Sequence, residues 1–145
     1  MAFLNSLNIS GSALTAQKFR MEVISQNIAN AETTTGGKAY RRKLVVLSER
    51  TNSFEESFEN ATSKIKTENN GGVEVSAIVE DNEAVRLEYD PDNPLANEEG
   101  YVEKPDINTV EEMIDMMSAS RAYEANITAF NAVKSMALKA LEIGK

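Results

Sequence analysis

The segment that decides the fold is INTVEEMIDMMSASRAYEANITAFNAVKSMALKALEI, residues 107–143. Its apolar and small residues recur in steps of three or four, which places them on one stripe of a single α-helix. At ~1.5 Å per residue this helix would reach roughly 55 Å, far beyond the ~11–12-residue average. No core built from this chain could cover so long a stripe, so the stripe needs a partner. Its members are Val110, Met113, Met116, Ala119, Tyr123, Ile127, Phe130, Val133, Ala137 and Leu141.

Both ends of this segment carry helix-boundary signals. Asn108 and Thr109 are N-cap residue types, and each is followed three residues later by a glutamate, as in a capping box. Acidic residues occupy the early turns and lysines the late ones, which suits the helix dipole. Gly144 offers a left-handed stop.

A second amphipathic segment spans residues 4–30. Leu7, Leu14, Met21 and Ile28 lie seven residues apart, the spacing of a coiled-coil seam, although polar residues interrupt the intervening places of that seam. Gly11 in its interior costs about 1 kcal/mol relative to alanine. This helix would be marginal alone, so we expect it to pair with the C-terminal stripe.

Composition restricts the function. The chain has 145 residues and a net charge of −8, and the stretch 48–106 alone contains 16 acidic and 5 basic residues, a balance that argues against nucleic acid as a partner. It has no Cys and no His, which removes thiol chemistry and the commonest general base and metal ligand. No run of about 18 apolar residues exists to insert into a membrane. The N-terminus lacks the features of a cleaved signal peptide.

The middle of the chain predicts short strands. The residues at 40–47 form a basic patch that leads into a strand, and this patch is either an anion or partner contact or a solvated strand edge guarded by positive charge. For 48–70 a short helix and a flexible excursion both stay open. Alternating residues at 73–79 and 85–89 predict a β-hairpin closed over Glu80 to Glu83, and 100–105 is expected to be an extended lead-in to the long helix.

Two terminal motifs resemble a known family. The segment ISGSALTAQKFRMEVISQNIANAET at 9–33, and SQNIAN at 25–30 above all, is similar to the N-terminal signature of bacterial flagellar rod and hook proteins. EMIDMMSASRAYEAN at 112–126 resembles the matching C-terminal end. YRRK at 40–43, YDPDNP at 89–94 and GYV at 100–102 are similar to the short proximal-rod members.

The resemblance implies a fold and a function. The fold would be α+β, mainly α, with long terminal helices packed as a coiled-coil-like layer and a small β-containing middle. Residues 1–35 and 106–145 would form the helical domain, and 36–105 the middle domain. The chain would be a structural subunit of the proximal rod of the flagellar basal body, polymerising into the drive shaft that transmits torque for motility. No catalytic, cofactor-binding or metal-binding residue is expected.

The resemblance also implies partners and a location. The partners would be other copies of the chain, proximal- and distal-rod subunits, a rod-base adaptor and the flagellar type III export apparatus. The location would be the periplasmic part of the basal body, reached without a cleaved signal peptide. Neither nucleic acid nor direct membrane insertion is expected.

The resemblance predicts an assembly interface on both helices. Asn27 and Asn30 are expected to hydrogen-bond the turn that leaves the first helix. Arg121 is expected to pair with a carboxylate across a subunit boundary, unless it lies on a solvated helix face. The predicted interface residues are Leu7, Leu14, Met21, Ile24, Asn27, Ile28 and Asn30 on the first helix and Met113, Met117, Arg121, Tyr123, Asn126, Ile127 and Phe130 on the last.

Two other classes of function stay open. A cytoplasmic coiled-coil adaptor or export chaperone would also use two amphipathic helices, but it has no reason to carry both terminal motifs. A hydrolase that uses surface carboxylates is disfavoured by the missing His and by acids that do not converge.

Overall fold

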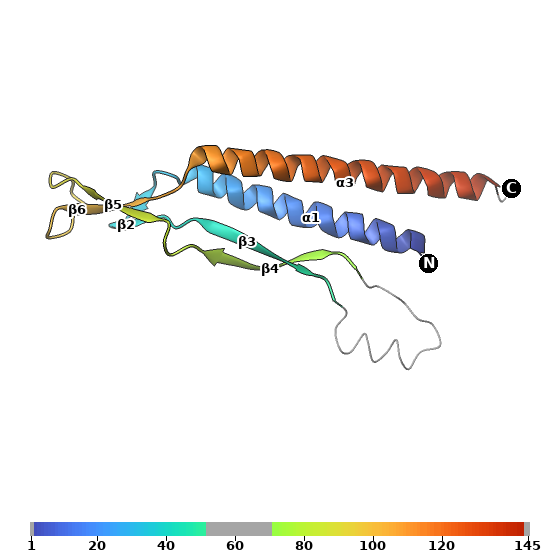
Figure 1. Ribbon diagram of the computed structural model, residues 1–145, viewed down its shortest axis with the longest axis horizontal. Helices are drawn as coiled ribbons and strands as arrows, with labels where there is room; N and C mark the ends of the chain where they lie inside the picture. Colours follow the sequence, from blue (N-terminus) through green and yellow to red (C-terminus); the bar gives the residue numbers. More distant parts are fainter. Residues whose placement is uncertain (1, 52–70, 144–145) are drawn as a thin grey trace.

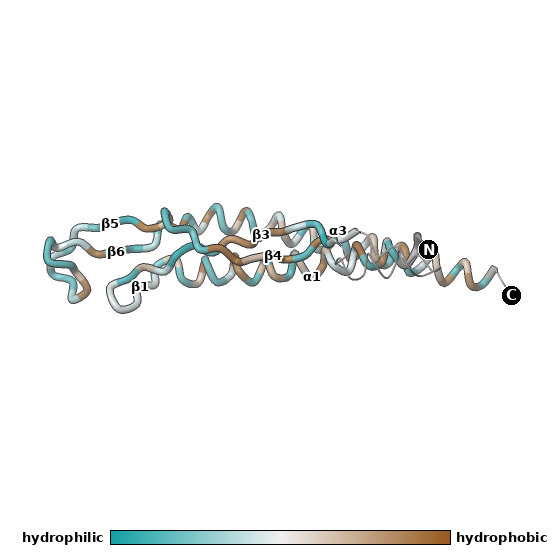
Figure 2. The backbone as a smooth tube through the Cα atoms, turned by 90° about the horizontal axis from the view of Figure 1, so that it is seen from below, coloured by the Kyte–Doolittle hydropathy of each residue, from teal (hydrophilic) through white to brown (hydrophobic). Residues whose placement is uncertain are grey.

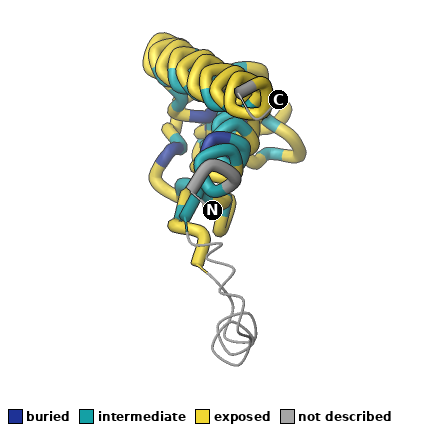
Figure 3. Tube along the Cα trace, turned by 90° about the vertical axis from the view of Figure 1, so that its right-hand side faces the viewer, coloured by how far each residue is buried: buried dark blue, intermediate teal, exposed yellow. Residues whose placement is uncertain are grey.

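The computed structural model describes residues 2–51 and 71–143 as three layers along one long axis (Figure 1). Helix α1 (Ala2–Ala29) is the middle layer, with helix α3 (Thr109–Ile143) along one side and strands β3 (Lys43–Glu49) and β4 (Val73–Glu80) along the other. The end-on view in Figure 3 shows the same order. The expected fold class, two long terminal helices with a small β-containing middle, is confirmed.

Helix α3 begins at an asparagine cap. The side-chain Oδ1 of Asn108 accepts a hydrogen bond from the backbone N–H of Val110 at 3.0 Å, and its carbonyl accepts one from Glu112 at 3.1 Å. Of the two predicted caps, Asn108 and Thr109, Asn108 is therefore the one whose side chain binds a free N–H group of the first turn. The predicted stop at Gly144 lies outside the described residues.

The buried line of α3 partly differs from the predicted stripe. Ala119 is fully buried, and the line continues towards the N-terminus through half-buried Met116 to buried Glu112. Met113 was predicted on this line but is 53% exposed. Two successive three-residue steps from Ala119 through Met116 to Met113 turn the line by about 120° at 100° per residue, so Met113 faces away from α1. Val110, Ile127 and Leu141 of the predicted stripe are exposed as well, so the chain itself leaves part of the stripe uncovered.

Helix α1 buries two faces rather than a single seam. The expected pairing of α1 with the C-terminal helix is confirmed, and the seven-spaced residues Leu7, Leu14, Met21 and Ile28 are half-buried. As the middle layer, α1 must contact α3 on one side and the strands on the other, which spreads burial around the helix. Its buried residues are Ser10, Ala16, Val23, Ile24 and Asn27.

The strands pair differently from the predicted hairpin. Strand β4 pairs with β3, antiparallel, with Val45 opposite Ile78 and a register shift between Val46 and Leu47. Strand β5 (Val85–Tyr89) pairs instead with β6 (Tyr101–Pro105), so the expected extended lead-in is itself a strand. The prediction that 73–79 pair with 85–89 is wrong because residue alternation indicates strands and faces but not partners. The linking residue Ala84 is buried, and its carbonyl accepts a hydrogen bond from the N–H of Asp106.

A tight hairpin follows α1. Strands β1 (Thr34–Thr35) and β2 (Lys38–Ala39) are joined by Gly36 and Gly37, whose φ angles of 62° and 81° suit a two-residue turn of type I′. Both strands contact β6. Figure 2 shows hydrophobic residues along β3 and β4 and mainly hydrophilic ones in the loop between β5 and β6. Most of 48–70, including the helix considered there, lies outside the described residues.

Candidate functional site: a polar junction and the helix faces

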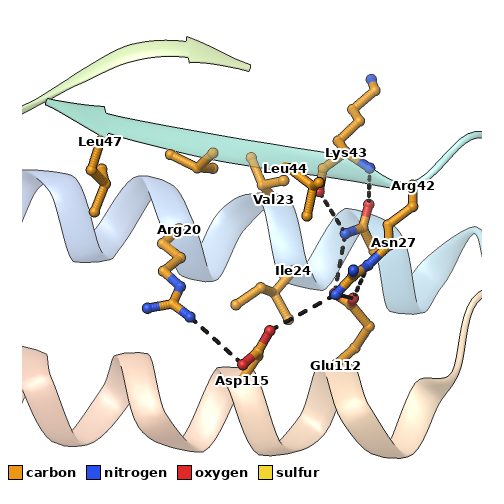
Figure 4. A pocket seen from close by; sticks show the side chains of 11 residues that line it. Arg20, Val23, Ile24, Asn27, Arg42, Lys43, Leu44, Leu47, Glu112 and Asp115 are labelled. Atoms are coloured by element: carbon orange, nitrogen blue, oxygen red, sulfur yellow. Dashed lines mark hydrogen bonds and ion pairs between the residues drawn. The ribbon is translucent and has the colours of Figure 1, made fainter. Parts of the chain in front are cut away.

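Five polar residues meet where α1, β3 and the start of α3 converge (Figure 4). We call this cluster the polar junction; it comprises Asn27, Arg42, Lys43, Glu112 and Asp115. Asn27 lies in the last turns of α1, Arg42 precedes β3, Lys43 is its first residue, and the two acids belong to the first turns of α3. The polar junction therefore joins all three layers.

Asn27 links α1 to the strand and to α3. Its Oδ1 accepts a hydrogen bond from the backbone N–H of Lys43 at 2.9 Å, and its Nδ2 donates to the carbonyl of Lys43 at 2.9 Å. The same Nδ2 donates to Glu112 Oε2 at 3.1 Å. Because the amide binds both backbone groups of Lys43, it acts as a short strand partner for the beginning of β3. Asn27 was predicted to bond the turn after α1, and its partners lie elsewhere.

Glu112 is a buried carboxylate held by an arginine. It is only 1% exposed, its Oε1 accepts a hydrogen bond from Arg42 Nε at 2.6 Å, and the same oxygen forms an ion pair with Arg42 Nη2 at 2.6 Å. Asp115 Oδ2 lies 3.9 Å from the same Nη2, and Asp115 Oδ1 lies 3.6 Å from Arg20 Nη2 on α1. A buried charge is tolerated only when it is paired and hydrogen-bonded, as Glu112 is here.

Tyr40 completes this arrangement. Its hydroxyl donates to Asn27 Oδ1 at 3.2 Å, and burial, followed by the charges of Glu80 and Glu112, raises the pKa of Tyr40. The Lys43 ammonium lies 5.6 Å from the centre of the Tyr40 ring. The basic patch was expected to bind an anion or partner or to guard a strand edge. At Arg42 neither reading is right, because its guanidinium is bound within the chain.

The polar junction borders an open groove of about 290 Å³. Apolar residues from α1 and β3, among them Val23, Ile24 and Leu44, form its walls. The carboxylates of Glu112 and Asp115 are already bound to arginine, so they offer no free acid–base pair. The described residues contain no group of three acids that could hold a metal ion. This arrangement is suited to fixing the three layers.

Sequence reasoning missed Arg20, Arg42, Glu112 and Asp115 as a connected group. Glu112 was interpreted as an acid that suits the helix dipole. Its position offered a signal, since it lies four residues before Met116 and seven before Ala119, on the buried line of α3. A carboxylate on a buried line requires a cation, but that cation is distant in the sequence.

The predicted interface residues occupy three environments. Ile24 and Asn27 are buried within the chain. The side chain of Asn30 donates to the carbonyl of Gln26 at 2.8 Å, at the end of α1. Arg121 is exposed and makes no ion pair with the described residues, so its pairing across a boundary stays a prediction. Half-buried are Leu7, Leu14, Met21, Ile28, Asn30, Tyr123, Asn126 and Phe130; exposed are Met113, Met117, Arg121 and Ile127.

The outer side of α3 exposes large apolar side chains. Val110, Met113, Ile114 and Met117 are between 53 and 62% exposed, within two turns of one another. Towards the C-terminal end, Met136, Leu138 and Leu141 are 60, 55 and 73% exposed. Clustered exposed apolar residues indicate a surface that binds a partner. No helix in the described part of the chain is long and apolar enough to cross a lipid bilayer.

Two family profiles match the two ends of the chain. Residues 7–38 match the family described as "Flagella basal body rod protein". Residues 98–143 match "Flagellar basal body rod FlgEFG protein C-terminal". The first match contains most of α1 and the second contains all of α3.

Curated relatives match over the whole length. A protein of Bacillus subtilis named "Flagellar basal-body rod protein FlgC" is 48% identical, with 100% of both chains covered. Proteins of the same name from Escherichia coli O6:H1 and Borreliella burgdorferi are 44 and 42% identical, covering 100% and 99% of this chain and 100% and 98% of their own.

Proposed function

Because the chain belongs to the family of flagellar basal-body rod proteins named FlgC, we propose that it polymerises with other rod subunits into the proximal part of the drive shaft. It is a structural subunit of the flagellar basal-body rod, with a role in motility. The adaptor or export chaperone considered from the sequence is not favoured by these relatives. The proposed role is mechanical and involves no catalysis.

The observation that carries the proposal is the exposed apolar face on the first turns of α3. We call Val110, Met113, Ile114 and Met117 the outer face of α3. Helix α1 already occupies the opposite side of α3, so the outer face has no partner among the described residues. Burying a methionine side chain contributes about 1.5–3 kcal/mol, so several such contacts per subunit would stabilise a polymer.

We propose that the terminal segments and the middle segment have different roles in the assembly. The terminal segments 1–35 and 106–145 form the layer that packs between subunits, and the middle segment 36–105 lies outside it. Heterologous contacts that do not close on themselves generate a helical assembly, which is the geometry of a shaft. Arg121, exposed on α3, pairs with a carboxylate of a neighbouring subunit in this arrangement.

We also propose the partners and the route of the chain. It assembles with proximal- and distal-rod subunits, with a rod-base adaptor and with further copies of itself. It reaches the periplasmic side through the flagellar type III export apparatus. The polar junction then supports assembly indirectly, since it holds α3 at a fixed position on α1.

The test introduces a charge on the outer face. Met113→Asp and Met117→Asp should abolish swimming and remove the chain from isolated basal bodies, because a carboxylate cannot be buried between subunits without a partner. Ser118→Asp is the matched control, since Ser118 is an exposed neighbour on α3 and receives the same charge. Normal swimming by both methionine variants, or an equal defect in the control, would overturn the proposal.

A further inference from the structure

The outer face of α3 contains two methionines on successive turns of the helix. Met113 and Met117 are four residues apart, so their side chains are neighbours on one side of α3. They are 53 and 55% exposed, and Figure 3 shows most of α3 as exposed. Both thioether groups are therefore accessible to small molecules in solution until a neighbouring subunit covers the outer face.

Three other methionines of the described chain differ in exposure. Met116 lies between Met113 and Met117 in the sequence, but it is half-buried on the line of α3 that faces α1. Met21, on α1, is half-buried as well. Met136 is 60% exposed, and it lies about five turns further along α3, outside the outer face. Access to the sulfur atom therefore separates Met113, Met117 and Met136 from the other two.

Methionine is the most easily oxidised type of side chain in this protein. The sequence has no Cys, no Trp and no His, so no thiol, indole or imidazole competes for an oxidant. Oxidation of a thioether to a sulfoxide requires access to the sulfur atom but no binding pocket and no catalytic group. A small oxidant that reaches the chain should therefore act first on the exposed methionines.

We propose that Met113 and Met117 are an oxidation site, and that their conversion to methionine sulfoxide by hydrogen peroxide prevents a free subunit from joining the rod. The sulfur lone pair attacks one oxygen of the peroxide, so an S–O bond forms and the O–O bond breaks. The leaving hydroxide takes the proton of the oxygen now bound to sulfur and becomes water. Sulfur loses two electrons, and the peroxide gains them.

The inference rests on the proposed function, in which a neighbouring subunit buries the outer face. A sulfoxide is polar and disrupts apolar interfaces that contain methionine. The other members of the outer face, Val110 and Ile114, have no side-chain group that could donate a hydrogen bond to the new oxygen, and burying an unpaired polar group is unfavourable. Oxidation at both positions should reduce incorporation about tenfold or more. A subunit already in the rod is protected, since its neighbour covers both sulfur atoms.

Oxidation of the purified full-length chain tests the site itself. The chain is treated with hydrogen peroxide, and tandem mass spectrometry follows the sulfoxide at each methionine over time. Met113 and Met117 should be oxidised several times faster than Met116 and Met21, because their sulfur atoms are more exposed. Equal rates at these four positions would overturn the assignment of the site.

A second experiment tests the effect on assembly in cells. A stable-isotope label and hydrogen peroxide are added together while new rods form, and labelled chain is recovered from isolated basal bodies and from the periplasmic fraction. The fraction of sulfoxide at Met113 and Met117 should be about tenfold lower in basal bodies, because oxidised subunits are excluded. Met136 is the internal control, and it should be oxidised to the same extent in both fractions.

A variant without the two sulfur atoms gives an independent measurement. Met113→Leu combined with Met117→Leu keeps the outer face apolar at similar side-chain volume. The readout is the ratio of incorporation with and without peroxide for each chain, so a changed baseline does not enter it. This ratio should fall for the unmodified chain and for the matched control Met136→Leu, and it should not fall for the double variant.

The outcomes separate the oxidation site from the proposed function. Equal sulfoxide fractions at Met113 and Met117 in basal bodies and periplasm would overturn the effect on assembly. The same loss of incorporation in the double variant as in the unmodified chain would overturn it as well. Absence of the unmodified chain from the basal bodies of untreated cells would instead contradict the proposed function, so untreated cells distinguish the two failures.

Discussion

The carboxylate of Glu112 lies 2.6 Å from two nitrogen atoms of Arg42, although 70 residues separate them in the sequence. This ion pair joins the first turns of α3 to the segment that enters β3, and Asn27 connects both to α1. The position of α3 along α1 therefore depends on a buried charge pair at one end. Without this ion pair, α3 could shift by one helical turn along α1 with little loss of apolar contact.

Glu112→Ala should lower the free energy of unfolding by about 3–5 kcal/mol, because it leaves Arg42 half-buried and without its main partner. Urea denaturation of the purified chain measures this loss. Glu88→Gln is the control: it breaks an exposed pair with Lys104 and should cost less than about 1 kcal/mol. Equal effects of the two substitutions would contradict the structural role of the polar junction.

Tyr40 should make the stability of the chain depend on alkaline pH. Burial raises the pKa of Tyr40 above its ordinary value of 10.0 in the folded state, so the folded chain binds the phenolic proton more tightly than the unfolded chain does. This contribution to the free energy of unfolding is complete below pH 10.0 and decreases as the pH rises through the higher, folded-state pKa.

Tyr40→Phe isolates this contribution. The variant should lose a pH-independent amount of about 0.5–1.5 kcal/mol for the hydrogen bond to Asn27. Its stability should then fall less steeply than that of the unmodified chain in alkaline solution, as measured by denaturant unfolding at a series of pH values. Parallel pH profiles of Tyr40→Phe and the unmodified chain would contradict this prediction, because they would mean that the Tyr40 hydroxyl has the same pKa in the folded and unfolded states.

The helices and the general architecture could be predicted because their signal is local and repeats along the chain. The stripe from Met116 through Tyr123 to Phe130 recurs over several turns, and no single residue decides it. The N-cap at Asn108 could be predicted for the same reason, since its partner Val110 is two residues away. Local hydrogen bonds leave local sequence patterns.

The contacts between distant segments could not be predicted in this way. Alternation at 85–89 indicated a strand, but nothing local distinguishes β4 from β6 as its neighbour. The Glu112–Arg42 pair is of the same kind, since either residue alone is compatible with an exposed surface. The buried faces of α1 also depend on its place between α3 and the strands, a tertiary property that its own period does not contain.

Gly72 holds the start of β4 close to α1. Its φ of 121° disfavours other residues, and a Cβ there would lie 2.6 Å from the Oγ of Ser12, which accepts a hydrogen bond from the N–H of Val73 at 3.1 Å. Gly72→Ala should therefore destabilise the chain by about 2–3 kcal/mol. Thermal unfolding compared with Gly36→Ala, where φ is 62° but the space is open, separates contact from backbone strain.

A second substitution, at Ser12, tests whether part of the loss in Gly72→Ala is steric. Gly36→Ala should cost about 1–2 kcal/mol from backbone conformation alone. Adding Ser12→Ala to Gly72→Ala should recover the steric part of the loss and leave the conformational part. If Gly72→Ala were no worse than Gly36→Ala, the close approach of β4 to α1 at Ser12 would not restrict residue 72.

Gly11 should behave in the opposite way, because it lies inside α1 with a helical backbone, and nothing outside its own stretch of helix lies within 4 Å of the position its Cβ would occupy. Gly11→Ala should raise the free energy of unfolding of the isolated chain by about 0.5–1 kcal/mol, since alanine restricts the unfolded chain and fits the helix without contact. Chemical denaturation measures the gain, and Ser25→Ala, at an exposed position of the same helix, provides the matched control. Because serine is only slightly poorer than alanine in a helix, the control should gain less.

A loss of stability in Gly11→Ala would mean that the space beside Gly11 is filled by the chain itself. A more stable variant that no longer swims would instead show that a neighbouring rod subunit approaches α1 at Gly11, where a side chain would obstruct it.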